Sequence, residues 1–204
     1  MQQILTANQI RGRSIGAIFF ICFGTGWFFL AITARQLITP ITVTGIMLGM
    51  VLLLLLALNL FRLSQRWPRV PNDPAVGRAF TWINAIQWTA IAIVVFSFAK
   101  LHMDAYITSA IASIIGLHLF PLARIFRYPL HYATGTLLVL WAAASAMLLP
   151  AGQMQGATSL GIGVILWSSA TVTLALAYQA AKRSGQLVAS WASSRRQGSL
   201  APAP

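Results

Sequence analysis

The sequence predicts an all-α polytopic membrane protein, an antiparallel bundle of six transmembrane helices with both termini in the cytoplasm. The first observation is composition, since 58% of the 204 residues are hydrophobic and the count of Asp and Glu is only 2. The second is a series of long charge-free stretches, because a helix crossing about 30 Å of hydrocarbon needs about 20 mostly apolar residues. The third is the uneven distribution of basic residues. Together these observations exclude a water-soluble globular protein.

The spans follow from the charge-free windows in chain order. Four windows before residue 124 each have the length of one crossing, whereas the run 128–181 is too long for one. We expect its turn-forming segment 150–156 to divide it into two spans. The chain is thus predicted to form a single domain over 1–183, followed by a loosely ordered cytoplasmic tail over 184–204. The predicted spans are about 14–34, 39–61, 79–99, 104–123, 130–149 and 157–181.

Orientation follows from the basic residues, because Lys and Arg near span ends are retained on the cytoplasmic side. With the N-terminus inside, only Arg35 and Lys100 of the 14 Lys and Arg residues fall in outside segments. The formal net charge of +12 is therefore interpreted as a topology signal. Binding of nucleic acid is not expected, since these charges are spread over four short segments and do not form one basic face.

The longest internal connection, from about residue 62 to 78, is predicted to be cytoplasmic. Arg62, Arg66 and Arg69 recur at helical spacing, as expected for a helix end at the level of the lipid headgroups. We expect these three residues to bind anionic headgroups. A specific ligand or partner site at the same residues is the alternative.

Polar residues inside spans are the best candidates for function, because the lipid makes them energetically costly. Thr81, Asn84 and Gln87 recur every three residues in the third span, which places them on one face. In the fourth span, His118 is predicted at a similar depth, roughly 8 to 14 Å from the cytoplasmic end. The sequence thus predicts a polar pocket open to the cytoplasm. The alternative is that these side chains only fasten helices together.

Pro121 and the basic residues after it extend this candidate site. Pro121 has no N–H, so the carbonyl of Leu117 lacks its usual helical donor and needs another partner. Arg124, Arg127 and His131 are expected to form a cationic rim at the membrane face, which would attract phosphate, carboxylate or lipid headgroups. The alternative is that the arginines only fix topology.

The segment 115–135 also carries a resemblance. Its Gly-x-His-Leu-x-Pro start, basic turn and following His-Tyr pair resemble small six-span bacterial membrane proteins that are classed only as domains of unknown function. This resemblance implies a six-span protein of the bacterial inner membrane and carries no activity with it. The positions that contribute to it are Arg11, Gly12, Asn84, Gln87, Gly116, His118, Leu119, Pro121, His131 and Tyr132.

Two functional classes remain open. The first is a small-solute permease or a ligand-binding membrane protein that uses the pocket in the cytoplasmic half. The second is a non-catalytic interaction or scaffold subunit of a larger complex. Gly45 and Gly49 match the small-xxx-small pattern of helix contacts, so a homo-oligomer is also open.

Enzymatic activity is not expected, because the sequence contains no phosphate-binding P-loop and no Gly-x-Ser-x-Gly motif. No metal or other cofactor is expected either. His102 and Asp104 are predicted on the outer side, whereas His118 is predicted near the inner one. His131 is predicted too close to the surface to pair with His118 as a haem ligand.

Overall fold

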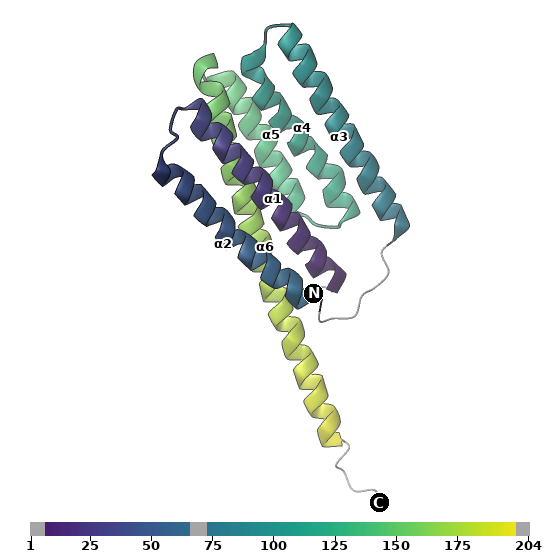
Figure 1. The fold of residues 1–204 in the computed structure, drawn as a ribbon. Helices are drawn as coiled ribbons and strands as arrows, with labels where there is room; N and C mark the ends of the chain where they lie inside the picture. The colour runs from purple at the N-terminus through teal and green to yellow at the C-terminus, as the bar shows by residue number, and fades with distance from the viewer. Residues whose placement is uncertain (1–6, 66–72, 199–204) are drawn as a thin grey trace, which may run out of the picture.

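The computed structural model describes residues 7–65 and 73–198, with side chains described within 8–65 and 73–183. Arg66 and Arg69 therefore lie outside the described residues. The described chain is helical and contains no strand, and each of its six helices is long and apolar enough to cross a membrane. The prediction of an all-α multi-pass membrane protein is confirmed at this level. The helices are α1 (Ala7–Ala34), α2 (Pro40–Ser64), α3 (Pro74–Lys100), α4 (Asp104–Ile125), α5 (Leu130–Leu148) and α6 (Ala151–Gly198), shown in Figure 1.

Helix starts follow from capping chemistry. α2 begins at Pro40, after Thr39 and Thr42 exchange the two hydrogen bonds of a capping box, at 3.0 and 3.2 Å. α3 begins at Pro74, and the carboxylate of Asp73 accepts a backbone N–H of its first turn at 2.8 Å. Proline suits the first helical position because the N–H it lacks would have no partner inside the helix.

α1, α2 and α3 extend further than the predicted spans, all at the same end of the molecule. α1 begins at Ala7, α2 continues to Ser64 and α3 begins at Pro74. The prediction stopped at the first charged residue, whereas a helix can continue through basic residues where its end reaches the polar headgroup region.

α6 differs from the prediction at its start. It begins at Ala151, so the segment 151–156, predicted as a connection, is helical. The carbonyl of Pro150 accepts the N–H groups of Gln153 and Met154 at 2.9 and 3.1 Å. The break in the long apolar run is therefore confined to the proline and the residue before it.

α6 also differs at its other end, where the helix continues through Gly198. The tail 184–204 was predicted to be loosely ordered, and its portion 184–198 is instead helical. Ser and Gly weaken helix propensity but Ala strengthens it, and each residue added to an existing helix gains one further hydrogen bond.

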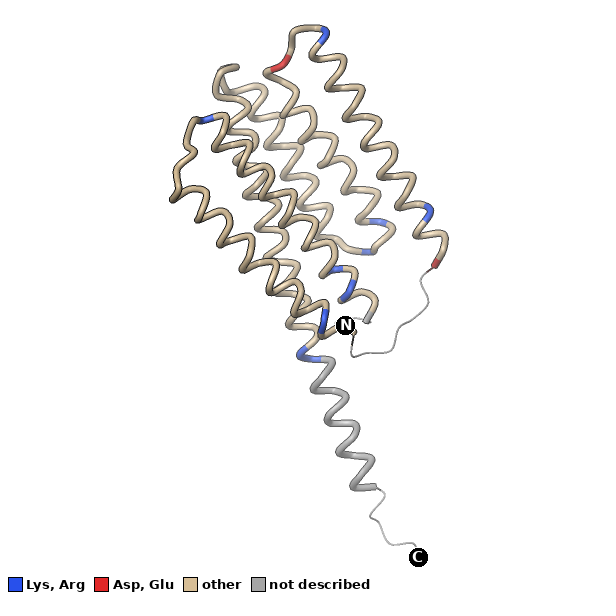
Figure 2. Tube along the Cα trace, in the orientation of Figure 1, with Lys and Arg blue, Asp and Glu red and all other residues tan. Residues whose placement is uncertain are grey.

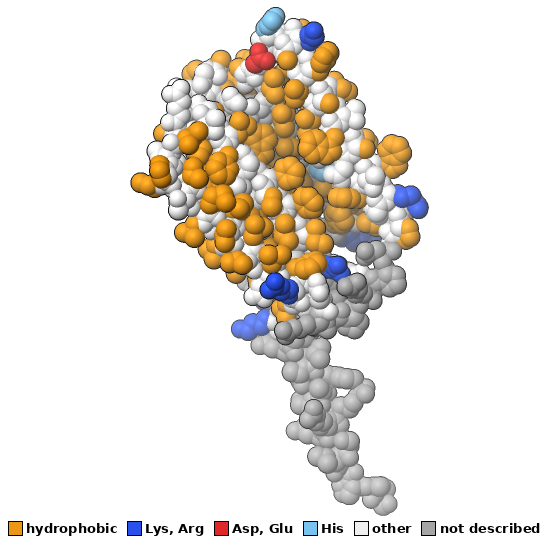
Figure 3. All heavy atoms as spheres, viewed as in Figure 1, with side chains coloured by type: hydrophobic (Ala, Val, Ile, Leu, Met, Phe, Trp, Pro, Cys, Tyr) orange, Lys and Arg blue, Asp and Glu red, His pale blue; other side chains and the backbone are white. Residues whose placement is uncertain are grey.

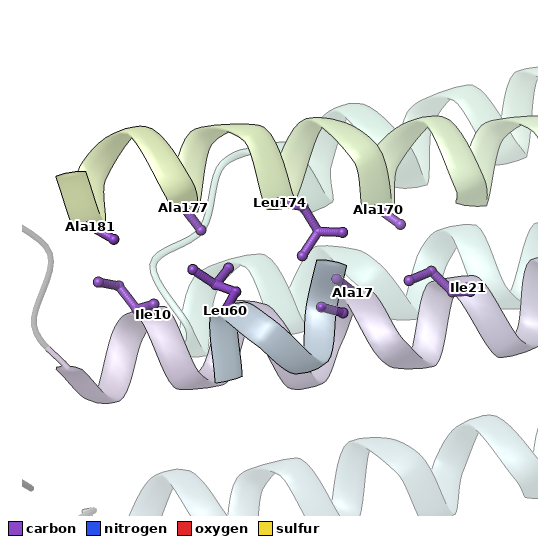
Figure 4. Packing of buried hydrophobic residues seen from close by; sticks show 9 residues of the cluster. Ile10, Ala17, Ile21, Leu60, Ala170, Leu174, Ala177 and Ala181 are labelled. Carbon is purple, nitrogen blue, oxygen red and sulfur yellow. The ribbon is translucent and has the colours of Figure 1, made fainter. Parts of the chain in front are cut away.

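The helices are arranged around α6, which packs against α1, α2, α4 and α5, whereas among the described residues α3 packs on α4 alone. The core has two parts, and α6 belongs to both. The first, the aliphatic cluster, joins α1, α2 and α6 and is shown in Figure 4; it comprises Ile10, Ala17, Ile21, Ala57, Leu60, Ala170, Leu174, Ala177 and Ala181. The second joins α4, α5 and α6 and comprises Ala112, Leu119, Leu122, Leu138, Ala142, Ile162 and Leu166.

Charge separates the two ends of the bundle. Figure 2 shows most described Lys and Arg residues at the end from which α1 starts, which we call the basic end. Hydrophobic side chains cover much of the face between the ends in Figure 3, as expected for a surface in contact with lipid. The basic end carries Arg11, Arg13, Arg62, Arg78, Arg124, Arg127, Lys182 and Arg183.

α4 and α5 approach closely at two glycines. A Cβ atom added at Gly116 would lie 2.7 Å from the carbonyl oxygen of Gly135, and one added at Gly135 would lie 2.5 Å from the carbonyl oxygen of Gly116. The backbones of α4 and α5 therefore come close together at Gly116 and Gly135. Small residues permit such contacts between membrane helices, and here the contact fixes α5 against α4 near the candidate site.

Candidate functional site

Three half-buried side chains lie on the face of α1 that is directed toward α4 and α5. Arg13, Phe20 and Trp27 are spaced by seven residues, which places them on one stripe of the helix. Phe20 and Trp27 pack against the core cluster of α4, α5 and α6. Arg13 is nearest the basic end of this stripe.

Arg13 lies over the ring of Tyr128, with its Cζ atom 4.5 Å from the ring centroid. Tyr128 belongs to the turn between α4 and α5, where Arg127 has a φ of 49° and the N–H of Tyr128 bonds the carbonyl of Ala123 at 3.0 Å. This left-handed residue ends α4 and turns the following ring inward. The phenol of Tyr128 donates a hydrogen bond to Thr173 of α6 at 3.0 Å.

Burial raises the pKa of Tyr128 above its ordinary value of 10.0, while the hydrogen bond to Thr173 and the charge of Arg13 act in the opposite direction. The phenol is therefore neutral at physiological pH. The ring face then remains available to the guanidinium of Arg13 as a cation–π partner.

His131 lies beside Tyr128 at the start of α5. Its ring makes edge contacts with Tyr128 and Phe20, at centroid distances of 5.0 and 5.6 Å. It is also near enough to His118 and Arg13 to interact with them electrostatically. Its Nδ1 atom is buried and has no hydrogen-bond partner in the structure.

His118 reaches the same region from α4. Its imidazole interacts with the backbone of Ile83 in α3, so the ring lies between these two helices. The Nδ1 atom of His118, like that of His131, is buried without a hydrogen-bond partner. We call Arg13, His118, Tyr128 and His131 the histidine–arginine cluster.

The cluster combines one cation with two unsatisfied imidazole nitrogens. The carboxylates of the chain lie elsewhere, since Asp73 caps the start of α3 and Asp104 begins α4 at the end away from the basic end. No acidic residue within the described part of the chain acts on Arg13. An imidazole nitrogen can donate or accept a hydrogen bond, so this set of groups is suited to an anion that bears further polar atoms.

The predicted site residues have different outcomes. His118 and His131 are near enough to interact electrostatically, and the ring of His131 contacts Phe20 and Tyr128 inside the bundle, whereas a place in a surface rim was expected. The close contact of α4 with α5 and the inward turn at Tyr128 place the ring of His131 between Phe20 and Tyr128.

Three other predicted residues are exposed at the protein surface. Pro121 lies on the outer face of α4, and Arg124 and Arg127 are exposed at the basic end. The side-chain amide of Asn84 donates a hydrogen bond to the backbone carbonyl of Phe80 in its own helix at 2.8 Å. This bond does not involve His118. Gln87 is half-buried on α3.

Sequence reasoning missed Arg13 and Tyr128. The sequence pattern indicates only a topology signal at Arg13 and assigns no role to Tyr128. The spacing of Arg13 with Phe20 and Trp27 could have indicated that this arginine faces the bundle.

Two hollows are the best formed among the described residues, and neither is lined by the cluster or by Asn84 or Gln87. One of about 450 Å³ opens beside Trp167 on α1 and α6, and one of about 200 Å³ lies beside Ser109 between α3, α4 and α5. No known protein family, curated protein or solved structure matches this chain. The site must therefore be interpreted from its own chemistry.

Proposed function

We propose that this integral membrane protein binds a small anionic ligand at the histidine–arginine cluster, as a ligand-binding protein or a solute permease. The single observation that carries the proposal is the pair of buried Nδ1 atoms of His118 and His131, which lack partners beside the cation of Arg13. Each unsatisfied buried polar group costs about 1–3 kcal/mol. A ligand that supplies oxygen atoms would satisfy both nitrogens.

Charge supports an anion over a neutral or cationic ligand. A half-buried guanidinium is costly unless a partner compensates it, and the Tyr128 ring supplies only part of that compensation. With acidic residues placed elsewhere, the missing negative charge would come from the ligand. Phosphate and carboxylate both match a guanidinium geometrically.

The proposed topology is an antiparallel bundle with the basic end and both termini in the cytoplasm of a bacterium, within its inner membrane. The concentration of Lys and Arg at one end supports this orientation. Arg62 at the end of α2 is exposed, which suits the proposed contact with anionic headgroups. In this orientation the cluster would be closest to the cytoplasmic leaflet.

A scaffold role is the second candidate, because one observation favours it. α3 has no buried residue and packs on α4 alone among the described helices. A helix with so much free surface could pack on a partner helix. Because such a role leaves the unpaired nitrogens of the cluster unexplained, we rank it second.

The test is anion-dependent thermal stabilisation of the purified protein in a nonionic detergent, with inorganic phosphate and octyl phosphate as probes. A ligand present at 100 times its Kd stabilises the folded state by about 2.7 kcal/mol. We expect at least one probe to raise the unfolding midpoint of the wild type and of the exposed control Arg78→Gln. Arg13→Gln should lose most of this increment.

His118→Ala should reduce the increment as well, while the midpoint without anion changes little. It removes one unpaired nitrogen and leaves Arg13 in place. If neither probe stabilises the wild type, or if Arg13→Gln responds like Arg78→Gln, the anion site does not exist. Comparing each variant with its own anion-free midpoint separates loss of binding from loss of stability.

A further inference from the structure

We propose that the anionic ligand is an amphiphile resident in the membrane, a phosphate ester with one alkyl tail, which enters from the lipid between α1 and α3. This inference rests on the proposed function and adds the chemical class of the ligand and its route. It follows from where the cluster lies relative to the two helices.

α1 and α3 form the two sides of a recess. α1 packs on α2 and α6, α3 packs on α4, and the backbones of α1 and α3 do not approach one another within the described chain. Figure 3 shows this region as a hollow between the two helices, with a histidine side chain visible inside it. The recess therefore opens sideways, on a surface that is covered by lipid in a membrane.

The recess is polar at one end and apolar along the rest. Arg13 lies nearest the basic end, and Phe20 and Trp27 follow it along the same stripe of α1. On the other side, Ile83 of α3 and Ile115 of α4 pack against the same core. An anionic head at Arg13 and a tail along these side chains would match both parts.

Gly16 indicates free space between the head and tail regions. It lies between Arg13 and Phe20 on the α1 stripe, and it is half-buried. A Cβ atom added there would meet nothing within 4 Å. A half-buried glycine with open space over it forms a notch in the wall of the recess, next to the cation.

The lateral opening also explains why a tail is needed. A soluble anion would have to leave water to reach the half-buried guanidinium of Arg13, which lies within the span formed by α1. An amphiphile already in the leaflet places its head at the level of Arg13 while its tail stays in hydrocarbon. Its tail then adds apolar contact area, at about 0.8 kcal/mol for each CH₂ group that leaves water.

The experiment compares two probes with the same phosphate head, octyl phosphate and inorganic phosphate, by their concentration at half-maximal stabilisation. We expect octyl phosphate to act at a concentration at least about tenfold lower. Octyl trimethylammonium, which has the tail and the opposite charge, should not stabilise the protein. If inorganic phosphate acts at the same concentration and depends on Arg13, the tail site is wrong while the proposed anion site stands.

Glycine variants on α1 test the recess itself. Gly16→Phe should fill the notch and raise the octyl phosphate concentration needed by at least about tenfold. Gly26→Phe is the matched control, because Gly26 is on the same helix, is exposed, and also has nothing within 4 Å of an added Cβ atom. An equal response of both variants would overturn the inference.

Photolabelling gives a readout that does not depend on the folding of a variant. An octyl phosphate with a diazirine at the tail end should label the wild type on peptides containing Phe20, Trp27 or Ile83. Excess unlabelled octyl phosphate should suppress this labelling. Labelling spread over α2 and the far face of α6, without competition, would contradict a defined tail site. A wild type that responds to neither phosphate would remove the proposed function as well.

Discussion

α6 packs on two different surfaces, and the contacts differ in kind. Toward α1 and α2 it meets the aliphatic cluster, in which Ala17, Ile21 and Leu60 have no exposed surface. Its side-chain hydrogen bonds on this side go to backbone carbonyls, from Trp167 to Ile21 at 3.1 Å and from Tyr178 to Leu56 at 2.9 Å. Toward α4, α5 and the turn between them it packs on the second core cluster and also forms hydrogen bonds that join two side chains. These are Thr158 with Ser109 at 3.3 Å, Ser169 with Thr134 at 2.8 Å and Thr173 with Tyr128 at 3.0 Å.

The difference shows that one set of contacts can stabilise a membrane bundle while another fixes the positions of its helices. Lipid tails are as apolar as leucine, so the aliphatic cluster gains mainly from close packing. Hydrogen bonds join particular pairs of residues, and they fix how far α4 and α5 slide along α6. The candidate site lies at the end of this polar contact, because Tyr128 bonds α6 on one side and contacts Arg13 and His131 on the other.

The largest expected effect comes from opening the α4–α5 contact with Gly116→Val. The first added carbon would lie 2.7 Å from the carbonyl oxygen of Gly135, and backbone cannot move away as a flexible side chain can. Overpacking of this kind costs about 1–3 kcal/mol or more, and we expect the upper part of that range. The free energy of unfolding in bicelles measures it.

Gly45→Val is the control for this variant, since a Cβ atom at Gly45 would meet nothing within 4 Å. We expect its stability to remain close to that of the wild type. Because the α4–α5 contact also positions His131, Gly116→Val should weaken anion-dependent stabilisation. Equal stability of the two valine variants would show that the glycine contact is not required.

A smaller effect is expected from Leu60→Ala in the aliphatic cluster. Leu60 is fully buried between α1, α2 and α6, so its truncation leaves a cavity. We expect a loss of about 2 kcal/mol, at the low end for buried leucines, because lipid replaces water as the alternative environment. Leu52→Ala on the exposed face of the same helix is the control.

This variant also tests the separation of the two surfaces. The aliphatic cluster and the α4–α5 contact use different residues of α6, so the anion response measured from the new midpoint should be unchanged. A loss of anion binding in Leu60→Ala would mean that the two surfaces are coupled through α6.

The sequence predicts the spans well because crossing a membrane depends on a local property, the apolar content of about 20 consecutive residues. The expected depth of His118 rests on a local property as well, since depth follows from helical rise. The sequence does not predict which face of a helix meets which neighbour. Asn84 was expected beside His118, yet its amide returns to Phe80 of its own helix.

Arg13 shows a second reason why the sequence does not predict the candidate site. Basic residues near span ends indicate topology in most cases. Composition does not distinguish such a residue from one that also faces the interior of the bundle. The role of Arg13 emerges only when the α4–α5 turn brings Tyr128 beneath it. The inward position of His131 depends in the same way on a tertiary contact, the approach of Gly116 to Gly135.

The smallest expected effect is that of Tyr128→Phe, which removes one hydrogen bond and keeps the ring under Arg13. Buried side-chain hydrogen bonds between membrane helices contribute about 0.6–1 kcal/mol, so we expect a loss of this size at neutral pH. The partner Thr173 would also lose its donor. A loss above about 3 kcal/mol would indicate a larger role for the phenol than one hydrogen bond.

The stability at alkaline pH distinguishes the contribution of the Tyr128 phenol group from the packing of its ring. Since burial raises the pKa of Tyr128 in the folded state, its contribution is fully present below the unfolded value of about 10 and is lost as pH rises toward the folded value. The wild type should therefore lose stability above pH 10 more steeply than Tyr128→Phe. Unfolding midpoints between pH 8 and 11, recorded with tyrosinate absorbance, measure the difference. Parallel curves for wild type and Tyr128→Phe would show that this phenol ionises as readily in the folded protein as in the unfolded chain, and that its contact with Thr173 of α6 does not shield it.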